Sequence, residues 1–215
     1  MIIDLSHRLT AQTAPFPGDP KFESTQVLTD AVDGYNVRAV RFSTHWGTHL
    51  DAPAHVNSAA ADVVSIPLTK LYGDCVCIPL NNKGNLKPDS TIALDYLTPF
   101  DTIINRNKKV LFQTGWRRFW NTPDYFAHAP GFSLDALEFL IQAQIEFLGF
   151  DLPSPCREND ELAGHRLLLN SGVVIVENMT NLDQLPVAPK TFVLSAFPLA
   201  IEGLDGFPVR ATAII

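Results

Sequence analysis

The chain is poor in charge and has few cysteines. Charged residues make up 18% of its 215 residues and hydrophobic residues 46%, a balance typical of a globular protein and not of a disordered one. Acidic residues outnumber basic ones by 23 to 16, and the resulting net charge of −7 disfavours nucleic acid and anionic membranes as partners. No apolar run approaches the roughly 20 residues that a membrane span needs.

The three cysteines do not form the even set of a secreted disulfide scaffold. Cys75 and Cys77 are two residues apart and are expected on one face of a strand, where a disulfide between them is disfavoured. Cys156 stands alone, and the N-terminus has no signal-peptide pattern. Repeats, low-complexity stretches and linkers are also lacking. We therefore expect one reduced, cytoplasmic domain that covers residues 1–215.

Short apolar segments and few helical patterns indicate a mixed α/β fold. A β-hairpin is expected at residues 22–43, because Asp33-Gly34 is a turn signal between two strand-like segments. Helices are expected around 94–97, 134–141 and 161–169. The other expected strands are 2–5, 74–80, 109–114, 145–150, 173–176, 191–197 and 209–215. These elements predict a single domain around a central mixed, partly closed sheet.

Three of the six histidines lie within eleven residues, together with one carboxylate. His45, His49, Asp51 and His55 are separated only by even offsets. In an extended segment the side chains alternate between two faces, so all four would point the same way. Imidazole nitrogen and carboxylate oxygen are the usual protein ligands of zinc and similar divalent ions. The pattern therefore indicates a metal site.

Two other structures are possible for this stretch. A helix could pair residues four apart, but Gly47 and Pro53 disfavour a regular helix. The four polar residues could also be ordinary loop or core residues. Burying them without partners would cost about 1–3 kcal/mol per group, however, and a metal ion would satisfy all four at once.

Four further features are candidates for a site. His165 lies in an otherwise apolar helical segment and Glu177 ends an apolar strand, so each would be costly to bury alone. Taken singly, each is more often an ordinary residue than a metal ligand. Phe16 lies in a rigid proline-rich loop and is either a core residue or a wall of a pocket. The aromatic segment 116–130 is either a lid over an apolar substrate, which we favour, or a loop packed on the body.

The histidine-rich stretch resembles the signature of a known family, the metal-dependent cyclases that include bacterial kynurenine formamidase (arylformamidase). The family pattern His-x-Gly-Thr-His-x-Asp-x-Pro-x-His is complete here as residues 45–55. Weaker resemblances follow in family order over nearly the whole chain. They are Asp4-Leu5-Ser6-His7, Pro17-Gly18-Asp19, Gly149-Phe150-Asp151, His165, Glu177, Asn181-Leu182 and Gly206-Phe207-Pro208-Val209-Arg210.

The resemblance implies a swivelling β/β/α fold and two metal ions per chain, usually zinc, with manganese as an alternative. His45, His49 and Asp51 would hold one ion. Asp51, His165 and Glu177 would hold the other, so that Asp51 bridges the two. Family members are commonly homo-oligomers, and a dimer or tetramer is therefore expected.

The resemblance also implies hydrolysis of a carbon–nitrogen amide bond in a small molecule, an aryl formamide such as N-formylkynurenine from tryptophan catabolism. His55 would be the general acid/base, not a primary ligand, and would pass a proton to the leaving amine. Phe16 departs from the family, whose formamidases carry at this position a Trp that contacts the substrate. It keeps an aromatic wall but lacks the indole N–H. Residues 56–62 also differ from the glycine-rich continuation of the family.

Two alternatives to this function were considered. The same site could open a cyclic amide, as in isatin-like substrates, or a lactone. The chain could instead be a metal-binding protein without catalysis. The presence of the acid/base candidate His55 beside every candidate ligand argues against the second alternative.

Overall fold

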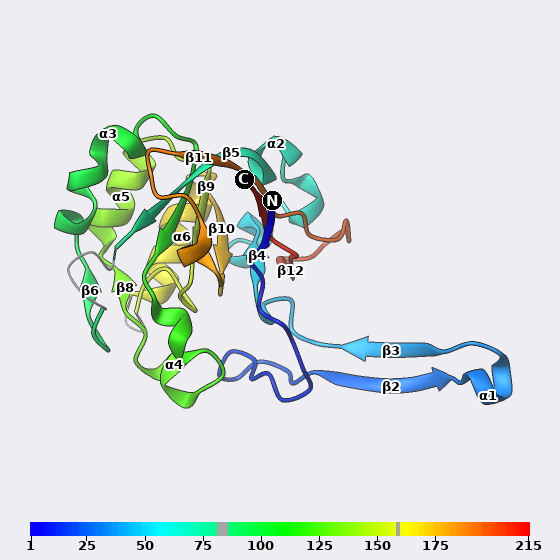
Figure 1. Ribbon diagram of the computed structural model, residues 1–215. Coiled ribbons are helices and arrows are strands. Elements are labelled where there is room, and N and C mark those ends of the chain that lie inside the picture. Colours follow the sequence, from blue (N-terminus) through cyan, green and yellow to red (C-terminus); the bar gives the residue numbers. More distant parts are fainter. Residues whose placement is uncertain (81–85, 158–159) are drawn as a thin grey trace.

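Nine strands of one mixed sheet carry most of the structure, a computed structural model that describes residues 1–80, 86–157 and 160–215 (Figure 1). In spatial order the strands are β1 (Ile2–Asp4), β13 (Thr212–Ile214), β11 (Thr191–Ser195), β5 (Tyr72–Pro79), β7 (Lys109–Gln113), β9 (Phe147–Phe150), β10 (Val174–Glu177), β4 (His49–Asp51) and β12 (Gly206–Pro208). The neighbours β5, β7, β9 and β10 are parallel, and the outer pairs are antiparallel. The predicted α/β class with a central mixed sheet is confirmed.

Apolar side chains fill both faces of the central strands, as is usual for parallel strands that are buried on two sides. On β7, Val110 and Phe112 belong to one core cluster and Leu111 to the other. The first cluster includes the buried apolar side chains of α5 (Leu134–Gln142) and α6 (Glu161–Asn170), which cover that face. The second cluster receives residues from β1, β4 and β13 as well as from the central strands, so the sheet curls around it.

Two small sheets and several short helices complete the described structure. β2 (Glu23–Leu28) pairs antiparallel with β3 (Val37–Arg41), and β6 (Thr91–Ile92) pairs parallel with β8 (Gly131–Phe132). The other helices are α1 (Asp30–Asp33), α2 (Leu68–Leu71), α3 (Asp101–Ile104), α4 (Pro123–Ala127) and the 3-10 helices η1 (Pro53–His55), η2 (Val63–Ser65), η4 (Leu94–Tyr96), η5 (Thr98–Phe100), η6 (Trp116–Phe119) and η7 (Leu182–Gln184). None of the helices in the described ranges combines the length and the apolar character that a membrane crossing requires.

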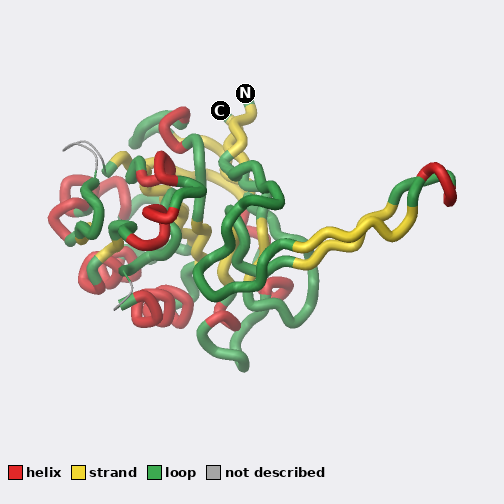
Figure 2. The backbone as a smooth tube through the Cα atoms, turned by 90° about the horizontal axis from the view of Figure 1, so that it is seen from below, coloured by secondary structure: helices red, strands yellow, loops and turns green. Residues whose placement is uncertain are grey.

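The hairpin of β2 and β3 leaves the body as a two-stranded arm with α1 at its tip, as Figure 1 and Figure 2 both show. Every residue of β3 is exposed, and Val32 in α1 is 84% exposed. The predicted hairpin is confirmed, with α1 just before the left-handed Gly34. An isolated two-stranded ribbon is only marginally stable in water, so the arm is expected to need another surface.

The prediction that the histidine-rich stretch is extended throughout is wrong. Only His49–Asp51 form a strand, and Pro53–His55 form η1. Gly47 has φ +72°, a left-handed conformation that glycine adopts readily, and it turns the chain between His45 and the strand. Pro53 cannot donate a hydrogen bond to a sheet and instead begins η1.

Two other regions also differ from the sequence patterns. Trp116 and Tyr125 are fully buried in the first core cluster, so the lid interpretation is wrong for these two residues. Strand β12 is not predicted, because glycine and proline are rare in strands. It lies at an edge of the sheet, where Pro208 is tolerated.

Candidate metal centre

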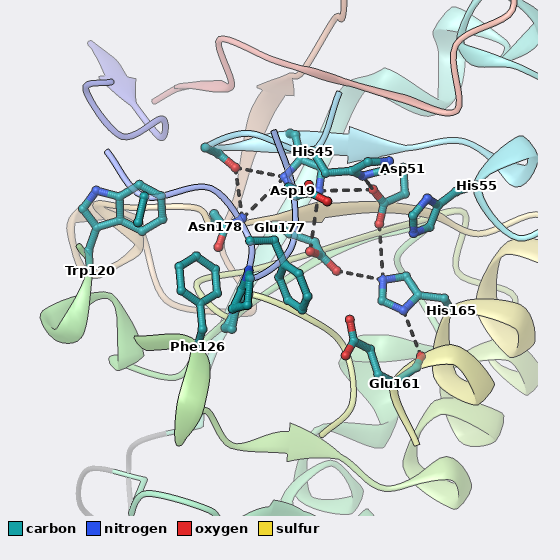
Figure 3. Close-up of a pocket in the computed structure, with 16 residues that line it drawn as sticks. Asp19, His45, Asp51, His55, Trp120, Phe126, Glu161, His165, Glu177 and Asn178 are labelled. Carbon is teal, nitrogen blue, oxygen red and sulfur yellow. Dashed lines mark hydrogen bonds and ion pairs between the residues drawn. The ribbon is translucent and has the colours of Figure 1, made fainter. Parts of the chain in front are cut away.

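Neighbouring strands bring the candidate ligands together. His49 and Asp51 are two residues apart on β4, so their side chains share one face of the sheet. β4 pairs antiparallel with β10, and the register places Glu177 opposite His49. Helix α6 contributes His165 from the side (Figure 3). His45 joins them from the turn before β4, with its Nδ1 2.8 Å from Asp51 Oδ1.

The two oxygens of Asp51 face different groups of histidines. Oδ1 lies 2.8 Å from His45 Nδ1 and 3.2 Å from His49 Nε2. Oδ2 lies 3.6 Å from His165 Nε2, which is itself 3.1 Å from Glu177 Oε1. In each of the two groups the candidate ligand atoms lie within 4.8 Å of one another. The structure thus places the five predicted ligands in two groups that share Asp51.

The outer nitrogen of each ligand-type histidine faces an acceptor. Nδ1 of His49 lies 2.9 Å from the Gly47 carbonyl oxygen, and Nδ1 of His165 lies 2.9 Å from the Glu161 carbonyl oxygen. A carbonyl only accepts, so Nδ1–H donates in both rings, and in the neutral tautomer Nε2 presents its lone pair to the cluster. This arrangement is the one by which metal-binding histidines are usually oriented.

The buried charge of the cluster also fits a cation. Asp51 is completely buried, and its Oδ2 has no hydrogen-bond partner among the described residues. Burial opposes ionisation, but the charge of His49 and the nearby rings of His165 and His45 hold the pKa of Asp51 well below its usual range. A carboxylate that stays ionised in such a place needs positive charge beside it. The imidazole and carboxylate donors suit zinc or manganese.

Two histidines of the cluster have raised pKa values. Burial lowers the pKa of His45, but hydrogen bonds to Asp205 and Asp51 outweigh burial and raise that pKa to about 10. Burial also lowers the pKa of His165, but the nearby carboxylates of Asp51 and Glu177 outweigh burial and raise that pKa to about 11. Both rings are therefore protonated at neutral pH until a metal ion competes for their nitrogens.

His55 stands apart from these two groups. Its side chain is 30% exposed, against 4% for His49, and it lines the edge of the pocket. Its ring centroid lies 4.1 Å from that of His45, and its Nδ1 lies 3.5 Å from Asp205 Oδ2. His55 belongs to neither group around Asp51, but it forms a third group with His45 and Asp205 whose candidate ligand atoms also lie within 4.8 Å of one another.

The cluster forms one side of a cavity of about 300 Å³ (Figure 3). Phe16, Trp120 and Phe126 also line it, and the Phe16 and Phe126 rings meet edge to face at 5.6 Å. Phe16 is half-buried, so of its two interpretations the structure favours the pocket wall. The cavity has the size and the aromatic lining that suit a small aryl molecule.

Two residues of this region are missed by the sequence patterns. Asp205 contacts His45 and His55, and its position just before the Gly206 motif is the only signal that the sequence offers. Asn178 is buried beside Glu177, lines the cavity and donates from Nδ2 to the Gly47 carbonyl oxygen at 3.0 Å.

Comparisons with known proteins agree with this geometry. A family model described as putative cyclase matches residues 3–155. A kynurenine formamidase of Salinibacter ruber (strain DSM 13855 / M31) is 30% identical over 214 residues, which cover 98% of this chain and 95% of the relative. A kynurenine formamidase of Bacillus thuringiensis (strain Al Hakam) is 32% identical over 212 residues, which cover 97% of this chain and 95% of the relative.

Solved structures share the fold over the whole chain. Isatin hydrolase A from Labrenzia aggregata, bound to benzyl benzoate, has a TM-score of 0.86 and 26% identity, covering 99% of this chain and 93% of that one. An isatin hydrolase bound to the product analogue thioisatinate has a TM-score of 0.85 and 22% identity, and the match covers 100% of this chain and 92% of that one.

Metal uptake should release protons. With pKa values of about 10 and 11, His45 and His165 carry protons at about pH 7.5, so zinc binding to the metal-free protein should release about two of them. Zinc affinity should accordingly rise with pH until these pKa values are approached. Titration calorimetry in buffers of different ionisation enthalpy counts the released protons. A binding heat that is independent of the buffer would contradict this assignment.

Proposed function

Because the chain belongs to the putative cyclase family, we propose that it hydrolyses the amide bond of an aryl formamide such as N-formylkynurenine. It is a metal-dependent amide hydrolase, as its kynurenine formamidase relatives and its fold indicate. The observation that carries the proposal is the buried Asp51 carboxylate shared by two ligand groups beside an aromatic cavity. All 215 residues are proposed to form one domain.

The five ligand-type residues are proposed to hold two ions per chain, zinc or, as an alternative, manganese. His45, His49 and Asp51 would hold one ion. Asp51, His165 and Glu177 would hold the other, and the contacts of both Asp51 oxygens support a bridging role. When bound, such ions supply Lewis-acid polarisation of the amide carbonyl and activation of water.

His55 is proposed to be the general acid/base. It lines the cavity and lies outside both groups around Asp51, so its ring is available for proton transfer. It would pass a proton to the nitrogen of the departing amine, since an amide nitrogen leaves poorly without one. Phe16, Trp120 and Phe126 would enclose the aryl ring and exclude water from it.

A cyclic amide is the second candidate substrate. The relative from Labrenzia aggregata is an isatin hydrolase, and it is 26% identical over 99% of this chain. Ring opening of isatin breaks the same kind of bond, and a lactone would need the same groups. The presence of His55 at the cavity argues against a metal-binding protein without catalysis.

The arm supports a homo-oligomer, a dimer or tetramer, as a further proposal. Val27, Val32 and Val40 are each more than half exposed on a ribbon that has little stability of its own. A second copy of the chain would cover these side chains. Light scattering checks the mass, and a monomer at micromolar concentration would refute the proposal.

A cytoplasmic location is also proposed, supported by three cysteines that are all free and buried.

Substitution should separate His55 from the ligands. His49→Ala and Glu177→Ala should lose bound metal and activity together, because each removes a ligand. His55→Ala should keep its metal and lose about 10²–10⁴-fold in kcat, the usual range for general acid–base catalysis. His55→Ala should lower kcat less for phenyl esters than for anilides, because the leaving group of a phenyl ester needs less protonation. Elemental analysis and steady-state kinetics measure these outcomes.

His128→Ala is the matched control, since His128 is half exposed and pairs with Asp89 at 3.1 Å outside the cavity. It should change neither metal content nor kcat. If His55→Ala lost metal as readily as His49→Ala, then His55 would be a ligand and the proton would come from another group.

Phe16→Ala should weaken the binding of aromatic substrates. The lost wall contributes equally to ground state and transition state, so KM should rise about tenfold, equivalent to ~1.4 kcal/mol, with kcat little changed. Phe22→Ala is the control, because Phe22 stacks on Trp46 at 4.8 Å and is not part of the cavity lining. A loss in kcat alone would assign Phe16 to packing.

A further inference from the structure

One carboxylate oxygen contacts two histidines that are proposed to have different roles. Asp205 Oδ2 lies 3.1 Å from His45 Nε2 and 3.5 Å from His55 Nδ1. We infer that Asp205 is a positioning residue that orients both the metal ligand His45 and the acid/base His55. This inference rests on the function proposed above and assigns a role to a residue outside the predicted site.

The fold fixes the position of Asp205 before any ligand binds. Its carbonyl oxygen accepts a hydrogen bond from Ala52 N at 2.9 Å, and β12 then pairs with β4. A Cβ on Gly206 would lie 2.6 Å from His45 Cε1 and 2.7 Å from the Leu50 oxygen, so only glycine allows this close approach. The main chain beside Asp205 is thus held against β4 and His45.

The orientation of the carboxylate is also set. Thr44 Oγ1 donates to Asp205 Oδ1 at 2.9 Å, which leaves Oδ2 directed at the two rings. The side chain of Asp205 is 43% exposed, but its Oδ2 lies within 3.5 Å of a nitrogen of each of two imidazoles whose centroids are 4.1 Å apart. A single acceptor at this point can receive an N–H from each ring.

The consequence differs for the two rings. His45 turns Nδ1 toward Asp51, so its outer Nε2–H donates to Asp205, and a carboxylate partner fixes the tautomer of a metal-binding histidine. His55 Nδ1 faces the same oxygen at 3.5 Å, so the inferred tautomer carries its proton on Nδ1 and leaves Nε2 free for the substrate. Asp205 therefore links metal binding and proton transfer through one oxygen.

Asp205→Asn tests this role, because it keeps the shape and removes the charge. At saturating zinc the variant should retain the wild-type number of ions, since Asp205 is not proposed as a ligand. Its zinc affinity, measured by competition with a chelator, should fall about 10–100-fold. Its kcat on formanilide should also fall about 10–100-fold at saturating zinc, with KM little changed and a smaller loss on phenyl formate.

The double variant with His55→Ala identifies the route of the effect. If Asp205 acts on turnover through His55, Asp205→Asn should lower kcat no further in the His55→Ala background, yet should still weaken zinc binding. Ring ¹⁵N spectra of the zinc-loaded protein report the His55 tautomer without any substrate. They should show protonated Nδ1 in the wild type and a mixed state in Asp205→Asn. If no formamide or ester is hydrolysed, the proposed function fails, while the affinity and the spectra still decide this inference.

Asp62→Asn is the matched control. Asp62 Oδ2 accepts a hydrogen bond from the backbone N–H of Gly203 at 2.8 Å, and Gly203 lies in the same segment as Asp205. It should leave zinc affinity and the spectra unchanged. Thr44→Val, which removes the donor to Oδ1, should reproduce the Asp205→Asn pattern at smaller size and serves if Asp205→Asn fails to fold. Loss of a whole ion in Asp205→Asn would make Asp205 a ligand. The inference would also be overturned if the losses in kcat of Asp205→Asn and His55→Ala were additive. The same holds if Asp205→Asn and Asp62→Asn had the same zinc affinity and spectra.

Discussion

The buried carboxylate of Asp51 is the constraint on which the rest of the site depends. Withdrawing a carboxylate from water costs on the order of several kcal/mol unless positive charge and hydrogen bonds compensate. His45 and His49 stand beside one of its oxygens and His165 beside the other. Both groups of candidate ligands include Asp51, so the proposed role of every other ligand depends on Asp51. Together with Asp205 and Glu177, this carboxylate raises the pKa values of His45 and His165.

The sheet topology makes this arrangement possible. β4 lies between β10, which supplies Glu177, and β12, which Asp205 directly precedes. Helix α6 packs near β10 and brings His165 over the same end of the sheet. Residues far apart in the sequence thus meet around a three-residue strand, and the aromatic walls close the remaining side. Strand register sets the positions of His49, Asp51 and Glu177.

The sequence predicts the site unevenly. The stretch from His45 to His55 is contiguous, so its metal-binding character is visible, although its backbone is a turn, a strand and a 3-10 helix where an extended segment was expected. His165 and Glu177 join it through tertiary contacts, and only the family resemblance links them to it in the sequence. Asp205 was missed because the following Gly206–Pro208 segment lacks the residues typical of strands. Likewise, the hairpin was predicted, but no local pattern encodes that it stands away from the body.

The central claim is that Asp51 is shared by two metal ions, and native mass spectrometry of the zinc-loaded protein tests it most directly. The account predicts two zinc ions per chain in the wild type. It also predicts that Asp51→Asn holds neither ion tightly, while circular dichroism shows that the fold is retained. A wild type that binds a single ion, or an Asp51→Asn variant that keeps the full wild-type complement, would contradict the claim.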